Sequence, residues 1–143
     1  MEELLELKEL LLHGEVENAL MLVEDMEEIG KKGIENNIRS LVKVLLIYFI
    51  KQEIEQRTTK SWNVYVRNCQ TEIEYINTRP KGKGYYLNDE ELREVISSSI
   101  NVAINYASLE VEEGIHHSQR IREMIDESEI ISRAFMLVKT DEY

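Results

Sequence analysis

The chain has 143 residues, the length of one globular domain, and its single proline and six glycines argue against a disordered protein. Its 17 basic and 28 acidic side chains leave a net charge of −11, which disfavours nucleic-acid binding because phosphate affinity rests on clustered Lys and Arg. The longest apolar run, residues 44–50, falls far short of the roughly 20 residues that a membrane-spanning helix needs. We therefore expect one domain over residues 1–143, with no membrane partner and no nucleic-acid partner.

The first residues of the chain and its cysteine content bear on its location. Met1 is followed by two glutamates rather than by basic residues, and no small-residue cleavage site follows the leucines at 10–12, so we expect no secretory signal. Cys69 has no second cysteine with which to form an internal disulfide, which fits a reducing compartment. These features predict a cytoplasmic protein.

Two helices are predicted before residue 30. Leucines recur at helical spacing over residues 3–12, and Gly14 ends that segment. A second helix is predicted over residues 16–29, where one apolar stripe faces an almost wholly acidic side. Gly30 follows as a left-handed cap that ends this helix.

Charge is unevenly placed along the first part of the chain. Residues 1–30 hold ten acidic side chains against Lys8, a net charge of −9, whereas residues 31–60 hold seven basic side chains against three acidic ones. Two interpretations stay open. Either the first helices pack against the basic one, or the acidic surface receives a basic partner.

The centre of the predicted fold is a pair of helices. Residues 32–56 form a long helix whose apolar face is broader than a surface helix needs. Hydroxyl groups in the connection, among them that of Thr59, suit the start of a following helix over residues 61–76. Its apolar stripe includes Trp62 and Tyr65, which we expect to be buried. Because the connection is short, the two helices should form an antiparallel core.

The remainder of the chain is also predicted to be helical. Residues 77–84 break the periodicity with one proline and two glycines, and form the one obvious loop. Asn88 followed by Glu91 is typical of a helix start, for a helix that runs to about residue 113. One or two further helices form a C-terminal extension over residues 115–138. The expected fold class is therefore all-α, a single-domain bundle of about five to six helices.

Several of these segments, taken together, resemble a known family. The residues that carry the resemblance are Glu17-Asn18, Val23 to Lys31, Leu41 to Leu46, and Arg57 to Trp62. In their order and spacing they are similar to the family called domain of unknown function 29, which is best known from cyanobacteria and proteobacteria. The resemblance covers about residues 15–110. It implies a bacterial protein with an all-α bundle, and it implies no established activity.

Two carboxylate patterns are candidates for metal binding. Glu113 and His116 have the Glu-x-x-His spacing used in di-iron helical bundles, but those sites need a second such pair and two more carboxylates. Glu24 and Glu28 lie four residues apart on one helix face, as in helical nucleotide pyrophosphohydrolases that bind magnesium, but the second half of that motif is missing. Solvated surface residues explain both patterns better. We therefore expect no metal and no cofactor, and keep these four residues only as candidates.

The sequence leaves open whether the chain is an enzyme, because no complete catalytic set stands out. The first hypothesis is a non-enzymatic helical protein-interaction module that self-associates or binds a protein, since the apolar face of residues 34–50 exceeds what one molecule covers. The alternative is a metal-dependent phosphoester or nucleotide hydrolase that uses helix carboxylates, through Glu24, Glu27, Glu28 and the Glu113–His116 pair. Exposure of Glu24 and Glu28 to solvent, rather than to a cleft, would count against the hydrolase.

Overall fold

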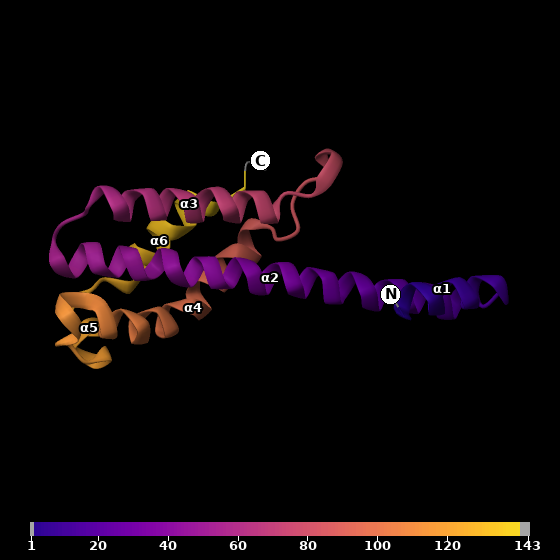
Figure 1. Cartoon of the computed structure of the whole chain (residues 1–143), viewed down its shortest axis with the longest axis horizontal. Helices are drawn as coiled ribbons and strands as arrows, with labels where there is room; N and C mark the ends of the chain where they lie inside the picture. Colours follow the sequence, from indigo (N-terminus) through magenta and orange to yellow (C-terminus); the bar gives the residue numbers. More distant parts are fainter. Residues whose placement is uncertain (1, 141–143) are drawn as a thin grey trace. The chain divides into compact units, whose positions relative to one another are not determined.

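A computed structural model describes residues 2–140, apart from the side chain of Glu113. These residues form six α-helices and two short 3₁₀ turns, and the part of the chain described holds no β-strand, which confirms the all-α prediction. The elements are α1 (Glu2–Leu12), α2 (Val16–Glu55), α3 (Lys60–Asn77), η1 (Pro80–Gly82), α4 (Asp89–Glu110), η2 (Val111–Gly114), α5 (Ser118–Met124) and α6 (Glu127–Val138) (Figure 1). None of the described helices is long and apolar enough to cross a membrane.

Internal contacts divide the chain into two compact units, Met1–Ile34 and Glu35–Tyr143. The first unit contains α1 and the beginning of α2, and the second contains the remainder of α2 and every later element. That residues 1–143 form a single domain stays a prediction.

The long helix α2 differs from the sequence prediction. It runs without a break over Val16–Glu55, so the predicted helix end at Gly30 and the predicted new start at Lys32 are wrong. Gly30 is not among the glycines with positive φ, whereas Gly14, with φ of 74°, does end α1 as predicted. A glycine costs a helix only about 1 kcal/mol relative to alanine, so α2 tolerates both Gly30 and Gly33, and no proline follows within α2 to stop the helix. The acidic and the basic segments therefore belong to one helix.

The predicted antiparallel pair of helices is present in the second unit. The α3 helix runs back along the later half of α2 (Figure 1), with Tyr48 and Tyr65 stacked at a ring-centroid distance of 5.5 Å. As predicted, a hydroxyl in the connection caps α3, because the Trp62 N–H donates to Thr59 Oγ1 at 3.0 Å. Tyr65 itself is 49% exposed, so its predicted burial is wrong. Its ring lies at the margin of the core, against Tyr48.

The core of the second unit is built from aliphatic side chains of α2, α3, α4, α5 and α6, and from Leu87 just before α4. The largest fully buried ones are Ile38, Val42, Leu45, Leu46, Ile50, Ile73, Leu87, Leu92, Ile96, Ile104, Ile121 and Ile130. Five of the twelve come from residues 34–50, the face that we predicted to exceed what one molecule covers. That prediction is wrong, because the second unit itself covers most of this face.

The side chains of two asparagines hold the connection between α3 and α4 by hydrogen bonds. The buried Asn77 amide donates to the carbonyl of Leu87 at 3.0 Å and accepts from its N–H at 2.8 Å. Asn88 then starts α4 in the predicted capping box with Glu91. At its other end, α4 stops at Glu110, about three residues earlier than predicted, and the chain continues into η2.

Candidate functional site

The predicted metal candidates are not drawn together into a ligand set. Glu24 and Glu28 are exposed on α2 in the first unit. His116 lies in the second unit, where its Nε2 is 3.1 Å from a carboxylate oxygen of Glu112. The side chain of Glu113 lies outside the described residues. Among the residues that are described, no group of three or more His, Cys, Asp and Glu side chains could hold a metal ion.

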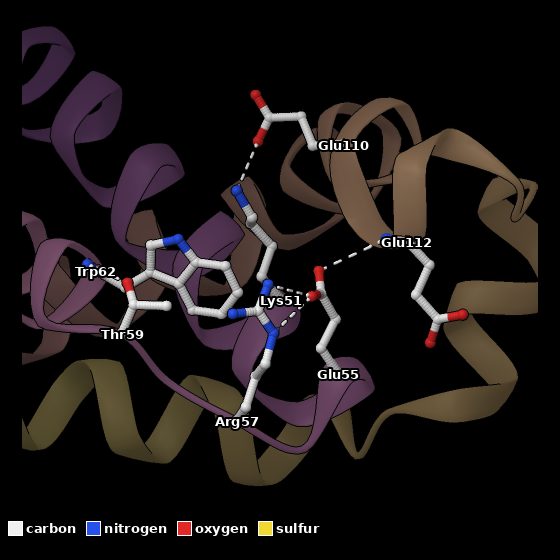
Figure 2. Close-up of polar contacts among 7 residues, drawn as sticks. All are labelled: Lys51, Glu55, Arg57, Thr59, Trp62, Glu110 and Glu112. Carbon is white, nitrogen blue, oxygen red and sulfur yellow. Dashed lines mark hydrogen bonds and ion pairs between the residues drawn. The ribbon is translucent and has the colours of Figure 1, made fainter.

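A polar cluster surrounds Trp62 at the end of the α2–α3 pair. Its members come from five different segments and line a cleft of about 450 Å³: Lys51 and Glu55 from α2, Arg57 from the connection, Trp62 from α3, Glu110 from α4 and Glu112 from η2. Figure 2 shows the Lys51 ammonium pointing toward Glu110 and the Arg57 guanidinium pointing toward Glu55. Trp62, which was predicted to be buried, is only half-buried in this cluster, and the cluster itself was not predicted.

Each cation of the Trp62 cluster already has an acidic partner within it. Lys51 Nζ is 3.4 Å from the Glu110 carboxylate, and the Arg57 guanidinium is 2.9 Å from that of Glu55. Both cations also lie against the indole, at 5.0 Å and 4.7 Å from its ring centroid. A ligand would have to displace these partners, so we interpret the cluster as a structural link between the α2–α3 turn and the end of α4.

A different feature marks the first unit, in which large apolar side chains are left uncovered. Eight of them, 53–70% exposed, define what we call the N-terminal apolar surface: Leu4, Leu5, Leu11, Leu12, Val16, Leu20, Met21 and Ile29. The described residues of this unit include one buried hydrophobic side chain, that of Ala19. The second unit exposes nine large apolar side chains over a stretch three times as long. Uncovered apolar surface is thus concentrated on residues 2–34.

Part of this surface is a shallow apolar cleft on α1. Its volume is about 320 Å³, and it is lined by Leu4, Leu7, Lys8, Leu11 and Leu12. The helical spacing of these leucines was predicted, and so was the apolar stripe over residues 16–29, but Val16, Leu20 and Ile29 of that stripe are exposed rather than buried. The width of the leucine pattern on α1 is ordinary for a helix that packs on one side, so it did not reveal that these leucines stay exposed.

Comparison with known proteins leaves the function to be inferred from the residues of the chain. No family model, curated protein or solved structure matches it. The resemblance of residues 15–110 to the family called domain of unknown function 29 therefore stays a prediction.

Proposed function

We propose that the chain is a non-enzymatic helical interaction module that binds another protein through its N-terminal apolar surface. The observation that carries this proposal is the imbalance in the first unit, where eight large apolar side chains are exposed and Ala19 is the buried hydrophobic residue among those described. Contiguous exposed apolar surface is uncommon on isolated soluble proteins, and it marks sites of association.

The first unit has little buried apolar surface of its own among its described residues. Its helix α1 has 11 residues, and isolated helices shorter than about 12–15 residues are marginal in water even with favourable composition. Most helical stability comes from packing an apolar face, and the leucines of α1 are largely unpacked. Fully burying one leucine side chain contributes about 1.5–3 kcal/mol, so a partner that covers several of them gains substantial binding energy.

The second unit supplies a scaffold for such a surface. It has a continuous aliphatic core, and its polar cluster at Trp62 is paired internally. The exposure of Glu24 and Glu28 supports the interaction module over the hydrolase, because neither carboxylate faces a cleft that could hold a substrate among the clefts described above. The proposal therefore places recognition on residues 2–34 and structural support on the later helices.

Photocrosslinking tests this proposal directly. A benzoylphenylalanine placed at Leu11, in the expressing cell, should give one defined adduct that can be identified by mass spectrometry and rebound as a purified protein. The matched control is the same photoprobe at Tyr75, which is 80% exposed on α3 in the second unit. We expect the control position to give no such adduct.

Binding of the identified protein, which can be a second copy of the chain, is then measured with purified variants. This shows whether binding depends on the N-terminal apolar surface or on exposed apolar side chains in general. The variant L4Q/L11Q/L12Q should lose binding, and Gln keeps a helix propensity close to that of Leu. The control variant Y75Q/L109Q/M136Q removes the same number of exposed apolar side chains from the second unit and should bind normally. Equal binding by both triple variants, or identical adducts from both photoprobe positions, would overturn the proposal.

A further inference from the structure

We infer that the partner of the N-terminal apolar surface is an amphipathic helix whose apolar face is flanked by Lys or Arg. This inference rests on the proposed function and names the chemistry of its partner. Two independent features of the first unit carry it, namely the shape of the exposed apolar row on α1 and the sign of the charge around it.

The shape of the surface fits a helix. Leu4 and Leu11 lie seven residues apart, close to two helical turns, so they project from the same side of α1 with Leu7 and Lys8 between them. The shallow cleft along this row is the type of surface into which an amphipathic helix packs its own apolar residues at i, i+3, i+4 and i+7. At about 1.5 Å per residue, α1 offers a contact about three turns long.

The negative charge of the first unit favours a positively charged partner. Residues 1–34 carry ten acidic and three basic side chains, a net charge of −7, whereas the other 109 residues carry 18 acidic and 14 basic side chains, a net charge of −4. On α1, the exposed carboxylates Glu2 and Glu9 neighbour Leu5 and Leu12 at helical spacings of three and four residues, whereas the one cation of the helix, Lys8, lies within the cleft. Cations along the Leu5–Leu12 margin of a bound helix would therefore meet carboxylates, and the negative field of the unit would attract such a helix from solution.

The same charge argues against a second copy of the chain as the partner. Pairing two N-terminal surfaces would bring a net charge of −7 against another −7, which is unfavourable for any arrangement that keeps the leucines in contact. A basic amphipathic helix gains from the apolar contact and from the electrostatics together. We therefore expect the chain to be monomeric when no partner is added.

The test uses the full chain and a fluorescent synthetic peptide of about 15 residues made of Leu and Lys, patterned as an amphipathic helix. Binding is followed by fluorescence anisotropy at low and at high salt. We expect saturable binding that weakens as salt rises, because exposed charges are screened. The variant L4Q/L11Q/L12Q should bind roughly a hundredfold more weakly, and Y75Q/L109Q/M136Q should bind like the wild type.

A second pair of variants isolates the charge. The variant E2Q/E6Q/E9Q should weaken binding roughly tenfold at low salt and should flatten the salt dependence. The matched control E72Q/E74Q/E94Q removes three exposed carboxylates from the second unit and should leave both unchanged. Circular dichroism should show the same helix content for all of these variants, because every substituted side chain is exposed.

Three results would overturn the inference. One is equal binding of a Leu/Glu peptide of the same pattern, and another is equal binding of a Ser/Lys peptide that has the charge without the apolar face. The third is a dimer of the chain alone, seen by sedimentation, that L4Q/L11Q/L12Q dissolves. If the Leu/Lys peptide does not bind but the photocrosslinked partner does, the partner chemistry is wrong and the proposed function stands. If neither binds through the N-terminal leucines, both fail.

Discussion

One helix, α2, has different surroundings in the two units that share it. Its residues 16–34 include a single buried hydrophobic side chain, that of Ala19, among those described. Its residues 35–55 include seven: Ile38, Val42, Leu45, Leu46, Phe49, Ile50 and Ile54. Both halves have apolar residues at helical spacing, and both are helical. Periodicity thus shows which face of a helix is apolar, whereas the burial of that face depends on whether another element of the same chain packs against it.

The largest expected effect comes from truncating one leucine in each of the two units, one buried and one exposed. Leu45 is fully buried, and L45A should lower the free energy of unfolding by about 2–5 kcal/mol, through lost apolar contact and the cavity left behind. Leu12 is 70% exposed, and L12A should change it by less than about 0.5 kcal/mol. Urea denaturation followed by circular dichroism measures both. Similar losses for the two variants would mean that the first unit is packed as tightly as the second, and would break the comparison.

A smaller effect is expected from removing the buried Asn77 side chain, which hydrogen-bonds the connection between α3 and α4. Asn77 holds both the N–H and the carbonyl of Leu87, so N77A leaves two buried backbone groups without these partners. Each such group costs about 1–3 kcal/mol, and partial access of water should keep the total loss near 2–3 kcal/mol. The control N18A removes an exposed amide in the first unit that contacts Glu15, and should be nearly neutral. Thermal unfolding compares them, and an unchanged midpoint for N77A would contradict this account.

A third variant tests the start of α4. N88A removes the side-chain oxygen that accepts from the Glu91 N–H at 2.8 Å, and should cost about 1 kcal/mol. N88S keeps an oxygen in the capping position and should recover most of that loss. Chemical denaturation is the measurement. Equal stability of the Ala and Ser variants would show that the cap contributes nothing beyond the packing of α4.

Local signals predicted much of the fold. The helix starts at Thr59 and Asn88 were recoverable because each depends on a side chain within three residues. The antiparallel pairing of α2 and α3 followed from a connection too short for another arrangement. The predicted helix end at Gly30 was wrong because a left-handed cap requires positive φ, and the sequence does not show whether a given glycine adopts it.

The N-terminal apolar surface was harder to predict, because it exists only where no other element of the chain packs against these side chains. The leucines of α1 were visible in the sequence, but whether another element of the chain covers them depends on long-range packing. The apolar face of residues 34–50 was wrongly predicted to exceed what one molecule covers, because its cover also depends on long-range packing. Helices from much later in the chain cover it, as Arg133 of α6 over the Phe49 ring illustrates. The cluster at Trp62 likewise joins residues about 60 positions apart in sequence, such as Lys51 and Glu110.

The thiol of Cys69 offers a chemical probe of the same contrast between units. Cys69 is 6% exposed on α3, and it is the only cysteine of the chain. Wild-type protein should react with Ellman's reagent more than about tenfold more slowly than a C69A/L12C variant, whose thiol lies on the exposed N-terminal surface. Addition of urea should abolish the difference. Equal rates in native buffer would indicate that α3 opens as readily as α1.

The smallest expected effect is the pH dependence that Cys69 gives to stability. Burial raises the pKa of this thiol above its ordinary value of 9.0, so the folded chain holds the thiol proton to a higher pH than the unfolded chain does. The contribution of the neutral thiol is therefore fully present below the unfolded pKa and is lost as pH rises through the folded pKa. The urea midpoint of the wild type should fall relative to that of C69A as pH rises from neutral to above 9.0. Burial is also the largest cause that raises the pKa of Tyr48, and because Cys69 is the smallest of the causes of that shift, most of the Tyr48 contribution is common to both proteins. A difference between the two proteins that stays constant with pH would show that Cys69 titrates alike in the folded and unfolded chain.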